Sequence, residues 1–221
     1  MVTHPDLIAA VKSGNVEVVR RLLDESPPLA YARDASGVSA LMYAFYYREK
    51  EVRDLLLASK FELDIFEATA AGKTDRVSEI LKRDPKAANR SSSDGFTPLH
   101  FAAFFDRPDI ARDLIRHGAD VRAVAQNAMK VTPLHSAAAA HSREIVRLLL
   151  DEGAPPDARQ QGCWTALHEA AQAGDQEMVK DLLEHGAGPL ARNDEGKSPA
   201  DLAQAKGQKE VLKLLRPTAD R

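Results

Sequence analysis

The tetrapeptides Thr-Pro-Leu-His at residues 97–100, Thr-Pro-Leu-His at 132–135 and Thr-Ala-Leu-His at 165–168 decide the fold of this chain. A degenerate fourth copy, Ser-Pro-Ala-Asp, occupies residues 198–201. Counted from the third residue of each copy, at 99, 134, 167 and 200, the steps are 35, 33 and 33 residues. Self-similarity at this period indicates stacked structural units.

Each copy marks the start of a two-helix unit. Thr or Ser stands where a helix N-cap is expected, and Pro follows at the first helical position, where its missing N–H costs nothing. In the unit that starts at Thr97, the spacing of Ile110, Leu114 and Ile115 predicts a second helix with one apolar face. Gly118 stands where that helix is expected to end. Because the apolar face needs a cover, each hairpin is expected to pack on its neighbours.

This pattern resembles the ankyrin repeat, and residues 134–154 match it closely. Weaker copies occupy residues 7–23 and 41–57, and a further copy starts at Ile65. The resemblance implies a mainly α ankyrin solenoid, in which stacked α-hairpins carry short β-hairpin fingers along one edge. We interpret residues 1–221 as a single domain with seven repeats, at approximately 1–33, 34–60, 61–91, 92–126, 127–159, 160–192 and 193–221.

Three departures from the pattern are informative. The step from Leu41 to Ile65 is 24 residues, so the third repeat is expected to lack the finger before its first helix. The step of 35 residues predicts a longer finger around residues 127–130. The first three repeats also lack a C-capping Gly and have Ser26, Lys60 and Asp84 at that position.

Composition narrows the class of partner. With 30 basic and 33 acidic residues the net charge is -3, so the phosphate backbone of a nucleic acid is not expected to be the main partner. Cys163 is the single cysteine, so no internal disulfide can form. Neither a signal peptide nor an apolar run of roughly 20 residues is evident, which predicts a cytoplasmic protein with no membrane partner.

The three motif histidines, His100, His135 and His168, raise the possibility of a metal site. Corresponding positions of stacked helical units lie roughly 8 to 10 Å apart, whereas zinc ligands lie about 2 Å from one ion. We therefore predict neither a metal nor a cofactor. The resemblance implies that each His braces its hairpin through hydrogen bonds to the Thr hydroxyl and nearby backbone.

A nucleophile pair of Cys163 and His168 would make the protein an enzyme. No third group is evident to orient the imidazole, and no glycine-rich phosphate loop follows a strand pattern. We predict no catalytic residues and regard an enzyme with an unrecognised site as the weaker alternative.

Charged residues on the predicted second helices are interpreted as a solvated convex surface. This set is Glu144, Arg147, Asp151, Glu177, Lys180 and Asp181. Exposed pairs such as Glu144 with Arg147 contribute only about 0.3 kcal/mol.

Aromatic residues make up only 5% of the chain, so their placement is informative. In the ankyrin pattern, the two residues before the mid-repeat turn and the residue before the motif Thr face the concave groove. Here these places hold aromatic rings, and Met129 lies on the longer finger. The predicted partner-binding residues are Tyr46, Tyr47, Phe96, Phe104, Phe105, Met129 and Trp164. Packing between repeats is the alternative role for these side chains.

Together these observations predict a monomeric, non-catalytic scaffold that binds a protein partner through its concave groove and fingers. A self-associating structural protein that uses the same aromatic surface remains the main alternative. The sequence identifies neither the partner nor the pathway.

Overall fold

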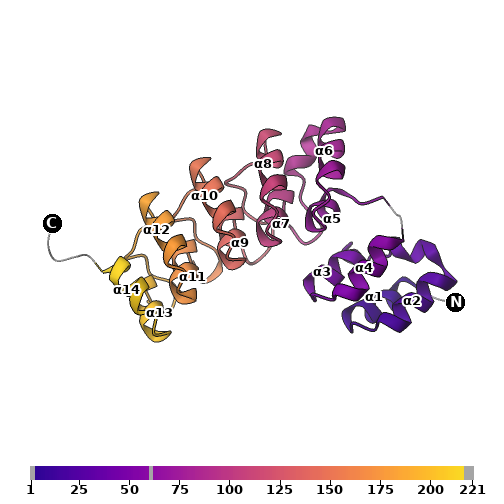
Figure 1. Ribbon diagram of the computed structural model, residues 1–221, viewed down its shortest axis with the longest axis horizontal. Coiled ribbons are helices and arrows are strands. Elements are labelled where there is room, and N and C mark those ends of the chain that lie inside the picture. Colours follow the sequence, from indigo (N-terminus) through magenta and orange to yellow (C-terminus); the bar gives the residue numbers. More distant parts are fainter. Residues whose placement is uncertain (1–2, 60–61, 217–221) are drawn as a thin grey trace. The chain divides into compact units, whose positions relative to one another are not determined.

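The computed structural model describes residues 3–59 and 62–216 of the chain (Figure 1). These residues form fourteen α-helices and three short 3-10 helices, which confirms the mainly helical class. The β-structure of the described part is one isolated antiparallel bridge between Arg33 and Ser39, so the expected fingers appear as loops. Within the same ranges no helix combines the length and the apolar character needed to cross a membrane.

The chain divides into two compact units, residues 1–76 and 77–221. In the first unit α1 packs against α2 and α3, α2 against α4, and α3 against α4 and α5. Leu7, Leu41 and Leu56 are fully buried in its core. Its helices are α1 (His4–Lys12), α2 (Val16–Glu25), η1 (Pro27–Tyr31), α3 (Ala40–Tyr46), α4 (Lys50–Ala58) and α5 (Ile65–Ala70), and α6 (Thr74–Arg83) spans the unit boundary.

In the second unit the helices form two rows (Figure 1). The first row packs in the order α7, α9, α11 and α13, and the second in the order α8, α10, α12 and α14. The bounds are η2 (Pro85–Asn89), α7 (Pro98–Phe104), α8 (Pro108–Arg116), α9 (Pro133–Ala139), α10 (Arg143–Asp151), η3 (Gln161–Cys163), α11 (Ala166–Ala173), α12 (Gln176–Glu184), α13 (Pro199–Ala205) and α14 (Lys209–Leu215). Residues 1–2, 60–61 and 217–221 lie outside the described residues. They include the predicted start of the first repeat, the predicted end of the last repeat, and Lys60 at the end of the second.

Helix ends follow the expected chemistry. Thr97 and Thr132 are the N-caps of α7 and α9, and the Pro after each is the first helical residue. Gly118 follows the C-cap residue His117 of α8 and adopts a left-handed φ of 82°, which a residue without Cβ does most readily. Ser26 and Asp84 instead have negative φ and lead through Pro into η1 and η2, so two of the earlier repeats end differently.

The motif histidines brace the second unit as predicted, and they also join successive helix pairs. In each motif the Thr hydroxyl and the Thr backbone N–H converge on the His Nδ1. The Oγ1 to Nδ1 distance is 2.8 Å in the pairs Thr97–His100, Thr132–His135 and Thr165–His168. Because Nδ1 accepts, the ring proton lies on Nε2. Nε2 donates to a carbonyl oxygen of the following loop, at 3.0 Å from His100 to Val131, 3.2 Å from His135 to Trp164 and 3.2 Å from His168 to Lys197.

The loop tips of the second unit are linked by single backbone hydrogen bonds. Each tip carbonyl accepts from an N–H of the next loop. The pairs are Gln126 N to Gly95 O at 2.8 Å, Gln161 N to Met129 O at 2.9 Å and Asp194 N to Gly162 O at 2.9 Å. One bond at each junction connects neighbouring loops without forming the ladder of a strand pair.

Connection lengths agree with the predicted departures. Residues 59–64 separate α4 from α5, whereas residues 84–97 separate α6 from α7. The connection that leads into the third helix pair, α5 and α6, is therefore short, and we call it the third connection. Residues 117–132 form the longest connection of the second unit, between α8 and α9.

The interpretation of the second helices as a uniformly solvated surface is wrong for Asp181. Its carboxylate is buried and accepts from Arg143 on the neighbouring helix, with Oδ2 2.6 Å from Nε. Glu144 pairs with Arg112 of α8. The reason is that second helices lie side by side, so Asp181 on the flank of α12 faces α10 and not water.

We expect His135→Ala to destabilise the protein by about 1 to 3 kcal/mol, because it removes the acceptor for Thr132 and the donor for the Trp164 carbonyl. Urea denaturation followed by circular dichroism measures the change. His4→Ala is the matched control, since His4 is exposed and lies outside the motifs. Equal stabilities of the two variants would contradict the bracing role.

Acid should weaken the brace at His100. Burial lowers the pKa of His100 from 6.5 to about 4, against a smaller opposing effect of the Val131 carbonyl. A lowered histidine pKa means that the unfolded chain binds the proton more readily. Stability is therefore fully present above about pH 6.5 and is lost as the pH falls towards 4, by about 3 kcal/mol at most. The free-energy difference between wild type and His100→Gln should shrink between pH 7 and pH 4.5, and a constant difference would argue against this linkage.

Candidate functional site

Helix α7 and the loop before it carry a row of four phenylalanine rings. The centroids of Phe96 and Phe101 lie 5.9 Å apart in an edge arrangement. Phe101 stacks on Phe105 at 6.3 Å with an interplanar angle of 5°, and Phe104 meets Phe105 edge-on at 5.2 Å. The structure thus brings together Phe96, Phe104 and Phe105, three of the predicted residues, through a fourth ring. We call these four residues the phenylalanine row.

The phenylalanine row runs from the interior to the surface. Phe101 is 3% exposed, Phe96 and Phe105 are half-buried, and the side chain of Phe104 is 45% exposed. Aromatic pairs at such distances contribute about 0.5 to 1.5 kcal/mol beyond their buried area. The row can therefore hold Phe104 in a fixed orientation while leaving much of its ring open to a ligand.

Sequence reasoning missed Phe101, the ring on which the row depends. Its position contained the signal, because Phe101 stands three residues before Phe104 and four before Phe105 on a helix. Residues at these spacings lie on one helical face and meet.

Met129 and Trp164 lie on successive loops of the second unit. Their backbones are fixed, since the Met129 carbonyl accepts from Gln161 and the Trp164 carbonyl accepts from His135. The Trp164 ring is half-buried and lies 5.8 Å from the ring of His168, while Met129 is exposed. Neither is a member of the phenylalanine row, so they are separate candidate contacts.

Tyr46 and Tyr47 belong to the first unit, where they contact a third tyrosine. The Tyr43 ring lies 6.4 Å from Tyr46 and 6.2 Å from Tyr47, and Tyr47 is exposed. The Lys12 ammonium lies 3.9 Å from the Tyr43 ring centroid, within cation–π range. Tyr43 was missed in the sequence for the same reason as Phe101: it precedes Tyr46 and Tyr47 by three and four residues.

An acid fixes the Tyr43 ring. Its hydroxyl donates to Asp34 Oδ2 at 2.5 Å. This bond, with further donors from Ser36 and Val38, lowers the pKa of Asp34 to about 2. Burial raises the pKa of Tyr43, and the bond to Asp34 raises it further. Tyr43 therefore remains protonated at neutral pH and continues to donate.

The geometry gives no support to a nucleophile pair of Cys163 and His168. Both ring nitrogens of His168 are engaged, Nδ1 with Thr165 and Nε2 with the Lys197 carbonyl. Burial also lowers the pKa of His168, which makes it a weaker base. Across residues 3–59 and 62–216, no three His, Cys, Asp or Glu side chains are placed to share a metal ion.

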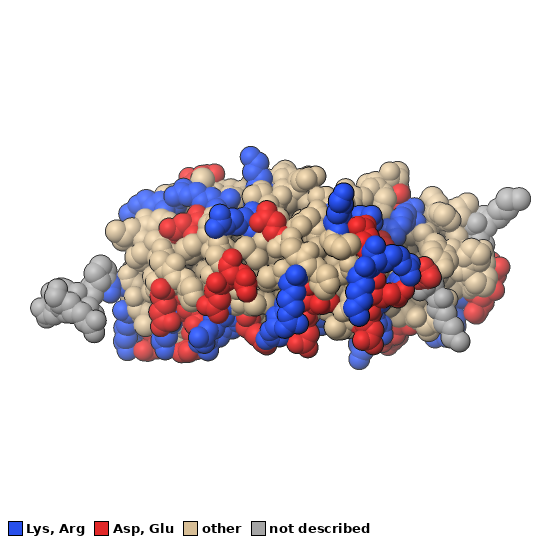
Figure 2. All heavy atoms as spheres, turned by 90° about the horizontal axis from the view of Figure 1, so that it is seen from above, with Lys and Arg blue, Asp and Glu red and all other residues tan. Residues whose placement is uncertain are grey.

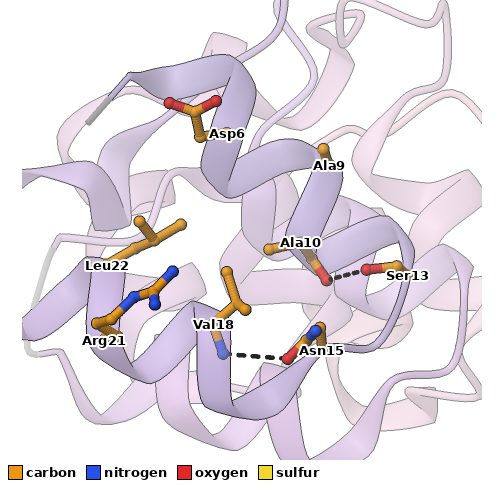
Figure 3. Close-up of a pocket in the computed structure, with 8 residues that line it drawn as sticks. All are labelled: Asp6, Ala9, Ala10, Ser13, Asn15, Val18, Arg21 and Leu22. Carbon is orange, nitrogen blue, oxygen red and sulfur yellow. Dashed lines mark hydrogen bonds between the residues drawn. The ribbon is translucent and has the colours of Figure 1, made fainter. Parts of the chain in front are cut away.

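A hollow of about 590 Å³ lies between α1 and α2 (Figure 3). Its lining includes Asp6, Ser13, Asn15 and Arg21. Three of these polar side chains already bond within their own helix ends: Asp6 with Thr3, Ser13 with the Ala10 carbonyl and Asn15 with the Val18 N–H. The hollow thus offers little chemistry to a ligand.

The face shown in Figure 2 carries charged side chains of both signs. Lys and Arg side chains lie interspersed with Asp and Glu side chains on that face. Ion pairs also join successive second helices, as Arg143 of α10 pairs with Glu177 and Asp181 of α12.

Comparison with known proteins gives a family match along most of the chain. The family model described as ankyrin repeats (3 copies) matches residues 6–67, 65–160 and 134–220. The matched segments overlap and extend across both compact units.

Three relatives illustrate the range of similar proteins. Ankyrin repeat domain-containing protein SAT10 of Stachybotrys chartarum is 31% identical over 72% of this chain and 8% of its own length. Target of rapamycin complex 2 subunit AVO2 of Saccharomyces cerevisiae is 27% identical over 70% of this chain and 39% of its own length. Ankyrin repeat and SAM domain-containing protein 6 of Rattus norvegicus is 34% identical over 47% and 12%. The chain spans well under half of each relative.

Truncating Phe101 and Phe104 separately should show which ring stabilises the fold and which is only exposed at the surface. We expect Phe101→Ala to cost about 3 to 5 kcal/mol, because it leaves a cavity under the row. Phe104→Ala should cost no more than about 1.5 kcal/mol, since nearly half of this residue's surface is already exposed to water. Urea titrations of both variants measure the difference, and equal costs would mean that the row is not anchored through Phe101.

Proposed function

Because the chain belongs to the ankyrin-repeat family, we propose that it is a non-catalytic scaffold that binds a protein partner. Proteins of this family generally mediate protein–protein interaction, and stacked repeats offer a long surface that binds with little ordering cost. The observation that carries the proposal is the phenylalanine row, a set of rings fixed from below and open at Phe104.

The proposed contact residues are those expected from the repeat pattern: Tyr46, Tyr47, Phe96, Phe104, Phe105, Met129 and Trp164. Large apolar side chains left in water are typical of interaction sites. Tyr and Trp are also enriched among residues whose truncation weakens binding by about 2 kcal/mol or more. Phe104, Met129 and Tyr47 are exposed, which supports their assignment as contacts.

The absence of catalysis is part of the proposal. His100, His135 and His168 use both ring nitrogens in structural hydrogen bonds, so none has a free nitrogen with which to take a proton from a substrate. A general base needs an available nitrogen near its substrate.

Several finer features complete the proposal. We place the contacts on a concave groove and its loops, in a monomeric cytoplasmic protein, with seven repeats in one domain over residues 1–221. The interspersed charges favour a protein over a nucleic acid as the partner. One relative is itself named as a subunit of a complex, which agrees with a role in binding proteins.

The test compares captured partners across matched variants. Tagged wild type, Phe104→Ala/Phe105→Ala and Trp164→Ala are used to isolate proteins from the native cell, with quantitative mass spectrometry as the readout. A partner that binds here should be depleted at least about tenfold by the aromatic variants, because each lost anchor weakens binding by about 2 kcal/mol. Tyr31→Ala, which removes an exposed ring outside the proposed set, should capture the same partner at wild-type level.

Two outcomes would change the assignment. Equal capture by both aromatic variants and wild type would move the binding surface elsewhere on the chain. Light scattering over a concentration series separates the alternative: a mass that doubles in wild type and not in Phe104→Ala/Phe105→Ala would indicate self-association through the same surface.

A further inference from the structure

Arg33 makes three contacts at one place in the first unit. It stands at the base of the loop before α3, where it bridges to Ser39. Its Nη1 donates to the Gly37 carbonyl at 3.2 Å, within its own loop. Its Nη2 lies 2.9 Å from Asp64 Oδ2 and 3.2 Å from Glu67 Oε1, at the start of α5. One guanidinium thus connects a loop of the second helix pair with the first helix of the third pair.

The contact with Gly37 compensates for the short third connection. At the corresponding tips of the second unit, the carbonyls of Gly95, Met129 and Gly162 accept from the backbone of the following loop. Residues 59–64 form a connection shorter than any of those loops. The Gly37 carbonyl accepts instead from Arg33, four residues earlier in the same loop.

The last loop shows the same arrangement and provides a comparison. Arg192 Nη1 donates to the Gly196 carbonyl at 2.5 Å, again four residues along its own loop. Its nearest acid is Asp201 at 3.6 Å, which lies in the helix pair of that same loop. Arg33 and Arg192 each donate to the Gly carbonyl four residues later in their own loop. Of the two, Arg33 alone also contacts the next helix pair.

Glu67 occupies the place of the motif histidine in the third pair. Like those histidines, it stands three residues after the N-cap, here Asp64, and accepts from the cap N–H at 3.1 Å. Unlike them, it has no N–H with which to donate to the following loop. Its second oxygen is 3.2 Å from Arg33 of the preceding loop, so the connection between pairs runs in the opposite direction.

Burial makes Glu67 dependent on this contact. The residue is 2% exposed. Burial raises the pKa of Glu67, and the neighbouring Asp64 carboxylate raises it further, while Ser39, the Asp64 N–H and Arg33 lower it. A buried carboxylate that loses its cation is strongly destabilising.

We propose that Arg33 acts as a latch that replaces the missing third finger and holds α5 against the loop before α3. The latch therefore couples the loop before α3 to the start of α5 through one side chain. Because Arg33 is 44% exposed on its side chain, salt screens the latch. The neutral, buried histidine braces of the second unit lack that sensitivity.

The test is native-state hydrogen exchange with mass spectrometry on the full chain. In Arg33→Ala, amides of residues 32–40 and 64–71 should exchange at least about tenfold faster, because α5 loses its anchor and Glu67 its cation. Amides of residues 99–183 should keep the wild-type rate. Arg192→Ala is the matched control, and its effect should be confined to residues 190–205.

Salt distinguishes a latch from ordinary packing. Raising the ionic strength from about 0.02 to 0.5 M should speed exchange of residues 32–40 and 64–71 in wild type, and should have little further effect in Arg33→Ala. Arg33→Lys should exchange at a rate between those of wild type and Arg33→Ala, because its ammonium keeps a cation beside Glu67 but cannot serve Gly37 and both acids with the geometry of a guanidinium. Exchange in Arg33→Ala equal to wild type, or faster exchange spread evenly along the chain, would overturn the proposal.

A second variant keeps the test decisive if Arg33→Ala does not fold. Glu67→Gln keeps the size of the side chain and an oxygen that can accept from the Asp64 N–H, and it removes the buried charge. It should reduce the salt dependence of exchange in residues 64–71 by at least half. Unchanged salt dependence in Glu67→Gln would contradict the latch.

Discussion

The hydrogen bond from each motif histidine to the next loop is the constraint on which the second unit depends. Because Nδ1 accepts from the Thr of its own cap, the proton lies on Nε2, and the acceptor must be a carbonyl of the following loop. That acceptor lies 31 residues after His100, and 29 residues after both His135 and His168. The two extra residues of the first interval are accommodated in the long connection that contains Met129, and the brace itself is unchanged. The repeat length thus matches the number of residues needed to place the acceptor carbonyl of the following loop beside the motif histidine.

Much of this architecture could be predicted from the sequence because its determinants are local. A Thr-Pro start and a Gly end act within one helix, so Pro98, Pro133 and Gly118 could be placed without knowledge of neighbouring helices. Contacts between repeats could not be placed in this way. Asp181 appears as one more charged residue on a helical face, yet its partner Arg143 is 38 residues away. Its burial depends on the packing of α12 beside α10. The sequence pattern does not show which side of α12 faces α10.

The candidate surface was predictable in part for the same reason. Positions before the mid-repeat turn identified Phe104 and Tyr47, and both are exposed. The rings that support them, Phe101 and Tyr43, follow from helix spacing, but their burial follows from the packing around them. Exposed rings are informative only together with what fixes them, because a mobile ring loses more entropy on binding.

The histidine braces and the joint at α5 differ in the charge and the hydrogen-bonding capacity of their central side chain. The histidine braces are neutral, buried and directed forward along the chain, so they are insensitive to salt and weaken only when acid protonates the ring. The joint at α5 uses a carboxylate, which can accept but not donate, so its partner must be a cation from the preceding loop. Because Glu67 stands where later pairs have a motif histidine, the contact between helix pairs at α5 is ionic and is made with the preceding loop, not with the following one. The salt concentration can therefore change the coupling at the joint at α5, whereas the hydrogen bonds of the histidine braces carry no net charge for salt to screen.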